Sequence, residues 1–263
     1  MEKGCIQMTL IQLDNYGPWT LSLGPGREPY LQVLQSELYA ELQRLFTFRG
    51  GLVFHCRFDN MLALTNGLSL SDHAEIQKRI SELFPVTVSM GVGLGGSPAE
   101  AQNRASRAVQ NRGSSRHEGR RAVLEVEGSV ESGRDCPVQI AHVDVDDVSR
   151  LTDSVSAYDL FVSMLRVHGA LTEEFLRHGS LVFFIGGDNF LVVSSGVTEE
   201  DYREALRNVS EKTGLKMKAG IGVGRSAKGA LELASGALDK IRGSRFSSDR
   251  RQGSPVILIE SRL

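Results

Sequence analysis

The chain has 263 residues, of which 41% are hydrophobic and 24% are charged; this composition is typical of a globular protein and excludes a disordered chain or a coiled coil. The formal net charge is only −2 at pH 7, so no overall field would recruit nucleic acid or an anionic membrane. No apolar run approaches the roughly 20 residues of a membrane-spanning helix, and no stretch near Met1 resembles a signal peptide. We therefore expect a cytoplasmic protein whose partners are neither nucleic acids nor membranes.

Cysteine and histidine usage argues against zinc. The three cysteines are far apart and form no C-x-x-C pair, which predicts neither a disulfide framework nor a thiolate zinc site. The six histidines occur in none of the common zinc-binding motifs. A catalytic metal would instead be held by carboxylates, which suits magnesium.

Apolar alternation and helical spacing predict the elements of the first half of the chain. In chain order they are a strand at 8–13, a helix at 31–45, two strands meeting at Asp59-Asn60, a helix capped at Asp72, a strand at 86–93, a helix beginning at Ser97-Pro98 and a strand at 122–126. The caps are predicted from a short polar residue followed three positions later by an acid. Residues 127–137, rich in glycine, serine and charge, indicate a linker.

The second half repeats the same order of elements, β-α-β-β-α-β-α-β, which indicates an internal duplication. Its elements are a strand at 138–143, a helix, two strands meeting at Asp188-Asn189, a helix capped at Thr198, a strand at 217–224, a helix beginning at Ser226 and a strand at 256–259. Residues 51–60 return as 179–189, and Gly91-Val92-Gly93 returns as Gly222-Val223-Gly224. We expect two domains, 1–130 and 137–263.

This order contains the split β-α-β arrangement of ferredoxin-like and palm folds. The expected fold class is α+β, with two duplicated palm-like domains. Each domain is predicted to be an antiparallel sheet with helices packed on one face.

The acids at the strand ends allow two alignments of the duplicated halves. Asp14 and Asp59 are 45 positions apart, and Asp144 and Asp188 are 44 apart. Pairing these acids gives both domains a two-acid set. In the second alignment Gln12 lies opposite Asp144, and only the second domain has both acids. The sequence leaves both alignments open.

In the predicted arrangement the strand ending at Asp144 neighbours the hairpin, so its carboxylate can face Asp188. Two unpaired carboxylates raise each other's pKa, whereas a shared divalent cation removes that repulsion and also binds triphosphate oxygens. Gly186 and Gly187 would let a nucleotide approach the backbone. Gly-Gly-Asp-Asn is also a common hairpin turn, but the acid at Asp144 favours a metal site.

Three further segments each have a functional and a structural interpretation. Residues 220–225 are similar to a phosphate loop, although close packing of a helix is the favoured explanation. Lys240 and Arg242 would contact a triphosphate in one interpretation and would simply suit the negative end of a helix in the other. The arginines between Arg104 and Arg121 are expected to form a solvated face or a linker, and nucleic-acid binding is the minor alternative because no aromatic residues are interspersed among them.

Several separate motifs closely resemble the archaeal-type GTP cyclohydrolase III family. The segments that carry the resemblance are residues 14–20, 58–60, 156–159, 184–190, 218–225 and 240–243. They extend over nearly the whole chain. Gly186-Gly187-Asp188 is also similar to the motif of diguanylate cyclases and of the wider class III nucleotide cyclase palm.

The cyclohydrolase resemblance implies a reaction, cofactors and an assembly. GTP would be hydrolysed to 2-amino-5-formylamino-6-(ribosylamino)pyrimidin-4(3H)-one 5′-phosphate with release of two phosphates, an early step of flavin or deazaflavin synthesis. Two Mg²⁺ ions would take part in two-metal catalysis, K⁺ would activate the enzyme, and zinc would not be used. The family also implies a homotetramer.

The predicted catalytic and metal-binding residues are Asp144 and Asp188, and Val145 is included in the metal-binding set. The predicted substrate-binding residues are Gly186, Gly187, Asn189, Asp14, Asn15, Asp59, Lys240 and Arg242. The first domain is expected to shape the substrate pocket or an interface, while the second carries the metal.

Two other functions stay open at this point. A nucleotide cyclase or nucleotidyltransferase would use the same metal scaffold, but the usual Gly-Gly-Asp-Glu-Phe has Asn189 in place of the glutamate, which argues against a cyclase. A non-catalytic GTP sensor with a degenerate palm would bind GTP without turnover. The sequence nominates no general acid or base for opening the imidazole ring.

Overall fold

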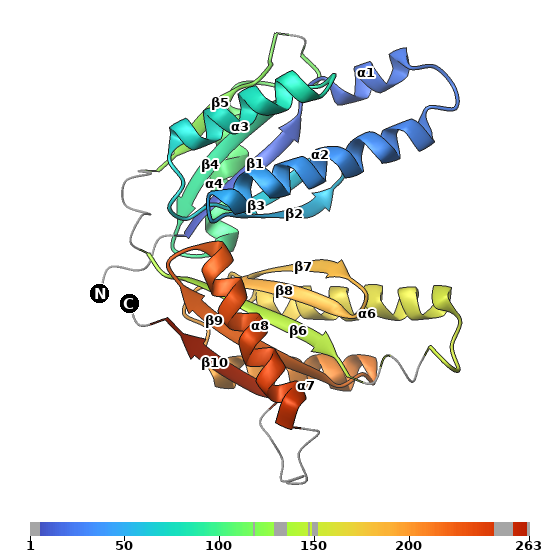
Figure 1. Ribbon diagram of the computed structural model, residues 1–263, viewed down its shortest axis with the longest axis vertical. Helices are drawn as coiled ribbons and strands as arrows, with labels where there is room; N and C mark the ends of the chain where they lie inside the picture. The colour runs from blue at the N-terminus through green and yellow to red at the C-terminus, as the bar shows by residue number, and fades with distance from the viewer. Residues whose placement is uncertain are drawn as a thin grey trace. The chain divides into compact units, whose positions relative to one another are not determined.

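The computed structural model describes residues 6–117, 119–128, 136–146, 148, 152–244 and 255–261. The chain divides into two compact units, Met1–Cys136 and Pro137–Leu263, named the N-terminal unit and the C-terminal unit. Figure 1 shows each unit as one sheet covered by helices. Most of the linker predicted at 127–137 lies outside the described residues. Among the described helices, none is long and apolar enough to cross a membrane.

The N-terminal unit contains a five-stranded sheet in the order β2-β3-β1-β4-β5. Its elements are β1 (Ile6–Leu13), α1 (Tyr16–Ser22), α2 (Glu28–Phe48), β2 (Leu52–Arg57), β3 (Asn60–Leu64), α3 (Leu70–Leu83), β4 (Val88–Gly95), α4 (Pro98–Gln110) and β5 (Leu124–Glu127). Neighbouring strands are antiparallel except β4 and β5, which are parallel. The order of elements matches the predicted order, with the short helix α1 added.

The C-terminal unit has the same topology, with the sheet order β10-β9-β6-β8-β7. Its elements are β6 (Val138–Val145), α6 (Ala157–Leu176), β7 (Leu181–Gly186), β8 (Asn189–Ser194), α7 (Glu199–Thr213), β9 (Met217–Gly224), α8 (Ala227–Ser244) and β10 (Val256–Glu260). Here β9 and β10 are the parallel pair. The predicted α+β class with two copies of one unit is therefore confirmed.

Two details of the fold prediction were wrong. The sheets are mixed and not antiparallel, because a helix joins β4 to β5 and another joins β9 to β10, and such a crossover returns the chain parallel. Helices also cover both faces of each sheet and not one face. In the C-terminal unit α8 packs on one face, while α6 and α7 pack on the other (Figure 1).

Side-chain alternation along β6 separates the two faces. Val143 and Val145 join the core formed with α6 and α7. The alternate residues, His142 and Asp144, face α8, where His142 meets Ser235. One face of the sheet is thus a hydrophobic core, and the other places polar side chains under α8.

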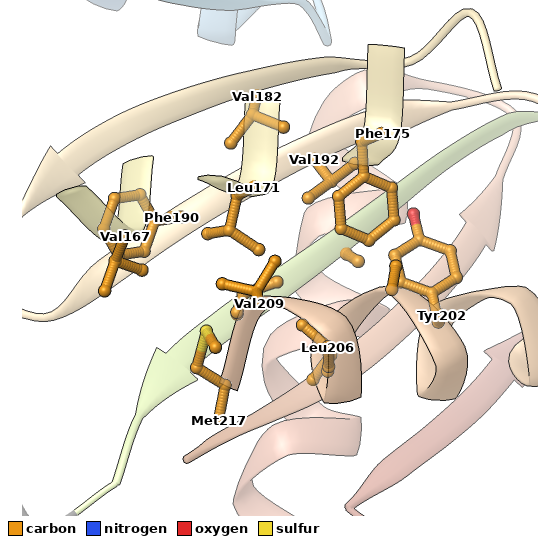
Figure 2. Packing of buried hydrophobic residues seen from close by; sticks show 14 of the residues in the cluster. Val167, Leu171, Phe175, Val182, Phe190, Val192, Tyr202, Leu206, Val209 and Met217 are labelled. Carbon is orange, nitrogen blue, oxygen red and sulfur yellow. The ribbon is translucent and has the colours of Figure 1, made fainter. Parts of the chain in front are cut away.

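The core face of the C-terminal unit is closed by aromatic and branched residues from α6 and α7, as Figure 2 shows. Phe175 of α6 lies against Tyr202 of α7 with ring centroids 4.9 Å apart. The hydroxyl of the fully buried Tyr202 makes a 2.7 Å hydrogen bond with Ser194 Oγ, so its polar end is satisfied inside the core.

The glycines of β9 allow α8 to lie directly on the sheet. A Cβ built on Gly222 would be 2.1 Å from the carbonyl oxygen of Ala230, and one on Gly220 would be 2.2 Å from that of Ala234. Close helix packing, the favoured explanation of this glycine pattern, is confirmed. Gly91 packs on Ala105 in the same way, so its counterpart is Gly220, and the predicted match with Gly222 was wrong by two residues.

Strand register settles the alignment of the two units. Gln12 pairs with Asn60 at the hairpin, and Asp144 pairs with Asn189. Gln12 is therefore the counterpart of Asp144, and the alignment of Asp14 with Asp144 is excluded. Spacing in the sequence did not reveal this correspondence, because the hairpin acid follows Gln12 by 47 residues in one unit and follows Asp144 by 44 in the other.

Most helix caps follow the prediction. Ser97 caps α4, and Thr198 caps α7 in a reciprocal capping box with Asp201. For α3 the predicted cap was wrong: Ser69 is the N-cap, and Asp72 is the third helical residue whose side chain completes the box. The capping-box pattern was present in the sequence but was placed one turn too late.

Candidate functional site

The predicted acids meet at one end of the C-terminal sheet. Asp144 lies near the end of β6, and Asp188 lies in the turn between β7 and β8. The amide nitrogen of Val145 donates a 3.1 Å hydrogen bond to the carbonyl oxygen of Asp188. The backbone of the two strands therefore fixes Asp144 and Asp188 beside each other, as the strand order predicted.

Asp144 is buried and is paired with two cations. Its Oδ2 lies 2.7 Å from Lys218 Nζ and 2.9 Å from Arg242 Nη2. Lys218 Nζ is also 2.7 Å from Oδ1 of Asp146. Asp144 and Lys218 are each less than a tenth exposed, and a buried charge is tolerated only when it is paired and hydrogen-bonded.

Lys218 comes from the strand directly beside Asp144. Register pairs Asp144 of β6 with Lys218 of β9, and both side chains lie on the face that α8 covers. Arg242 reaches the same carboxylate from the last turn of α8. Two acids and two bases thus form a compact cluster whose formal charges cancel, with the carboxylate of Asp188 close by.

Asp188 is partly exposed, and no cation lies within ion-pair distance of it among the described residues. Its Oδ1 accepts a 2.7 Å hydrogen bond from Asn189 Nδ2. Gly186 and Gly187 have φ angles of +109° and +62°, so the turn itself requires glycine there. A Cβ on Gly186 would meet nothing within 4 Å, which leaves open space over this turn as well. The geometry is therefore compatible with both interpretations of the glycine pair, a hairpin turn that requires glycine and a place where a nucleotide could approach the backbone.

His142 connects the turn to α8. Its Nε2 is 2.9 Å from Asn189 Oδ1, and its Nδ1 is 3.3 Å from Ser235 Oγ. Burial lowers the pKa of His142, and the nearby Arg242 lowers it further, although the hydrogen bond to Asn189 opposes them. His142 is thus favoured in its neutral form.

The predicted basic pair at the end of α8 is separated by the helix. Arg242 reaches Asp144, whereas Lys240 is exposed. Two residues along an α-helix are about 200° apart, so one helix cannot aim both side chains at one place. Contact of Lys240 with a triphosphate stays a prediction.

Sequence reasoning missed Lys218, His142 and Ser235 as members of the site. A signal was present for the first two, because each is a charged or polar residue inside a strand whose neighbours are apolar or glycine. Such a residue must find a partner in the fold. Ser235, in the middle of α8, offered no comparable signal.

The corresponding end of the N-terminal unit is filled by an arginine. Arg120 Nη2 donates a 2.6 Å hydrogen bond to Gln12 Oε1 and lies 3.4 Å from Asp14 Oδ1. Asp14 also accepts hydrogen bonds from Thr87 Oγ1 at 2.9 Å and the Ala122 amide at 2.8 Å. Asp14 and Arg120 are each 4% exposed, so the solvated position predicted for Arg120 was wrong and Asp14 is engaged inside the unit.

The other two residues predicted in this unit differ from Asp14. Asn15 adopts a left-handed φ of +50°, and its buried Oδ1 has no hydrogen-bond partner among the residues that the structure describes; backbone strain with an unsatisfied polar atom is typical of a functional position. Asp59 is paired with the guanidinium of Arg57. Burial raises the pKa of Asp59, but hydrogen bonds from Arg57 and Asn60 outweigh it, and the net shift is downward.

The donor chemistry at Asp144 and Asp188 fits magnesium. Both offer carboxylate oxygens, and Mg²⁺ is usually bound through one or two carboxylates together with substrate phosphates. No group of three or more His, Cys, Asp or Glu side chains is placed to hold a metal within the part of the chain that the structure describes. Val145 could offer only its backbone carbonyl, because its side chain is in the core. Asp147, which follows Asp146 in the sequence, lies outside the described residues.

One hollow of the described structure belongs to the N-terminal unit and does not include these acids. It has a volume of about 630 Å³ and lies along the loop between α4 and β5. Arg112, His117, Arg120, Arg121 and Glu125 line it with neighbouring loop residues. None of its lining residues belongs to the predicted site.

Comparison with known proteins identifies the family of the chain. A family model described as GTP cyclohydrolase III matches residues 8–251. GTP cyclohydrolase III of Methanothermobacter thermautotrophicus is 47% identical over 239 residues, which cover 90% of this chain and 95% of the relative. The enzyme of the same name from Methanocaldococcus jannaschii is also 47% identical, over 90% of this chain and 88% of the relative.

Solved structures give a weaker likeness. The active GGEEF domain of a diguanylate cyclase from Vibrio cholerae has a TM-score of 0.38 and 12% identity, over 48% of this chain and 84% of that chain. At this level it assigns no function. The sequence match along nearly the whole length of the chain identifies its family: the chain belongs to the GTP cyclohydrolase III family.

Proposed function

We propose that the protein is a GTP cyclohydrolase. It hydrolyses GTP to 2-amino-5-formylamino-6-(ribosylamino)pyrimidin-4(3H)-one 5′-phosphate and two phosphates. The observation that carries this proposal is the family match over residues 8–251, together with the two acids, Asp144 and Asp188, at one end of the C-terminal sheet.

The cofactors, assembly and pathway in this proposal rest on the family resemblance. The enzyme uses two Mg²⁺ ions, is activated by K⁺, needs no zinc and assembles as a homotetramer. It supplies an early intermediate of flavin or deazaflavin synthesis. The oxygen donors of Asp144 and Asp188 support the choice of magnesium.

The residues of the cluster have distinct tasks in the proposed reaction. Asp144, Asp188 and the carbonyl of Val145 would hold magnesium, which when bound polarises phosphoryl oxygens and lowers the pKa of water. Lys218 bridges Asp144 and Asp146 and keeps the buried acids neutralised before any ligand binds. Arg242 has a half-exposed side chain, so its guanidinium can pair with Asp144 and still reach a phosphate oxygen.

The turn and the strained asparagine support the substrate-binding part of the proposal. Gly186 leaves space at the turn where a nucleotide would approach. Asn15 has a buried acceptor that no described residue pairs with, and this acceptor would take a hydrogen bond from a nucleotide amino or hydroxyl group.

A direct assay separates this function from its alternatives. Purified protein is mixed with GTP and Mg²⁺, with and without K⁺, and the ultraviolet spectrum and inorganic phosphate are followed over time. Loss of the purine spectrum with two phosphates per GTP is the expected result. An intact purine spectrum with pyrophosphate release would indicate a cyclase or nucleotidyltransferase, and saturable GTP binding without any turnover would indicate a sensor.

A further inference from the structure

Four side chains of the C-terminal unit form one hydrogen-bonded chain that ends at Asp188. Ser235 of α8 contacts His142 of β6, His142 contacts Asn189 of β8, and Asn189 contacts Asp188 in the turn. We propose that His142 is a positioning residue: acting through Asn189, it holds the carboxylate of Asp188 in the orientation needed to bind a divalent cation. This inference rests on the proposed function, in which Asp188 is a working carboxylate.

The chemistry of the groups fixes the direction of each hydrogen bond. An ionised carboxylate only accepts, so the amide nitrogen of Asn189 must face Asp188, at 2.7 Å. The amide oxygen of Asn189 then faces His142 at 2.9 Å, and it too can only accept. His142 must therefore donate from Nε2.

The far side of the imidazole completes the chain. In the neutral Nε2–H form of His142, Nδ1 is an acceptor, and the hydroxyl of Ser235 lies 3.3 Å away as its donor. Every donor in the chain has an acceptor. Removing the Nε2–H of His142 would leave the oxygen of Asn189 unpaired and would free its amide to rotate away from Asp188.

The N-terminal unit holds its hairpin acid without a histidine. Leu10 occupies the position of His142, since Leu10 pairs with Gly91 as His142 pairs with Gly220. In that unit Asn60 also hydrogen-bonds the hairpin acid Asp59 and accepts a 2.9 Å hydrogen bond from Gln12. Arg57 pairs with Asp59 in addition.

The two ways of holding an acid differ in charge. The guanidinium of Arg57 orients a carboxylate and also neutralises it. A neutral amide orients the carboxylate and leaves its charge available. The relay through His142 therefore leaves the charge of Asp188 available to a cation, while the added arginine neutralises Asp59.

Substitutions at His142 test the relay in the full-length protein. H142L copies the residue that the fold already accepts at Leu10, and H142Q keeps an N–H donor near the position of Nε2. Wild type and both variants are compared for Mn²⁺ affinity by electron paramagnetic resonance, for kcat and KM with GTP and Mg²⁺, and for Tm. H178Q, at an exposed histidine of α6's C-terminal turn, serves as the control for a histidine outside the site.

The relay predicts that H142L weakens Mn²⁺ binding and lowers kcat about 10-fold to 100-fold, the range for residues that orient a metal ligand. H142Q recovers most of both, and H178Q matches wild type. S235A, which removes only the outer donor, changes both quantities in the same direction by less; it stands in for H142L if that variant does not fold.

Mn²⁺ affinity in H142L within twofold of wild type would overturn the relay, and so would equal losses in H142L and H142Q. Absence of Mn²⁺ binding by the wild-type protein would overturn it too. Failure of the proposed function has a different signature: wild type that binds Mn²⁺, with the expected ranking of variants, but leaves the purine spectrum of GTP unchanged.

Discussion

The two units have the same backbone fold but differ in the charged residues at one end of the sheet. In the N-terminal unit an arginine, Arg120, lies beside Gln12 and Asp14, and the single acid is fully engaged. In the C-terminal unit Asp144 replaces the glutamine, and Lys218 and Arg242 balance the added charge. A duplicated fold can thus keep its packing in both copies while the charged groups at the same end of the sheet differ between them.

The hairpins repeat this contrast. Asp59 has an arginine partner beside its amide partner Asn60, whereas Asp188 has a neutral amide partner and no cation partner among the described residues. The glycines at 186 and 187 make the second hairpin open where the first carries Arg57 and Phe58. Sequence similarity at the Asp-Asn pair therefore does not mean similar chemistry, because the residues around the pair decide whether the acid is neutralised.

The largest expected effect tests the difference between the two hairpin acids, Asp188 and Asp59. We expect D188N to lower turnover by 100-fold to 1000-fold, roughly the effect of removing one electrostatic stabiliser of the transition state, with an unchanged Tm. D59N should change turnover by less than about fivefold, because a partly exposed ion pair contributes about 0–1 kcal/mol. Steady-state assays of both variants measure turnover. A comparable loss of turnover in D59N would mean that the N-terminal unit takes part in the chemistry.

The second prediction concerns the buried cations. K218M leaves Asp144 and Asp146 without their shared partner and should destabilise the C-terminal unit by about 3 kcal/mol. Millimolar Mg²⁺ should restore part of this loss, because the metal can replace the missing positive charge. R120M is the matched variant of the N-terminal unit, where Mg²⁺ should restore nothing.

Urea unfolding with and without Mg²⁺ measures both variants. The two units can unfold in separate transitions, so each is followed by its own midpoint. Equal recovery of K218M and R120M by Mg²⁺ would contradict the assignment of the cation site to the C-terminal unit.

A smaller effect tests the similarity of the units and not their difference. G222A forces a Cβ to 2.1 Å from the carbonyl oxygen of Ala230, and G93A forces one to 2.2 Å from that of Ala101. Both should be destabilised by about 1–3 kcal/mol, the usual cost of overpacking. G236A, on the open side of α8, should instead be stabilised by about 0.5–1 kcal/mol. Thermal unfolding of the three variants gives the comparison, and a neutral G222A would contradict the close packing.

The smallest expected effect is at the helix caps. The hydrogen bonds from Thr198 hold the pKa of Asp201 below its ordinary value. The stabilisation is therefore present above the unfolded-state pKa, about 3.9, and is lost as pH falls through the lower folded value. T198A should cost about 1 kcal/mol at neutral pH, with a smaller difference from wild type below about pH 4. Unfolding curves at several pH values test this, and S69A is the matched variant for α3.

The sequence by itself determined the features that depend on near neighbours in the chain. Helix and strand order, the cap at Thr198 and the glycine pattern under α8 follow from side-chain periodicity and short-range hydrogen bonds. The duplication was visible for the same reason. The nearness of Asp144 and Asp188 also followed, because a split β-α-β order leaves few ways to arrange its strands.

Only the tertiary structure decided which residues complete the site. Lys218, His142 and Arg120 reach their partners across strands or loops, and a shift of one residue in register would turn each side chain to the other face. Register also decided that Gln12, and not Asp14, corresponds to Asp144. These contacts join residues far apart in the chain, so no local sequence pattern predicts them. The charge balance that distinguishes the two units exists only once the sheets have formed.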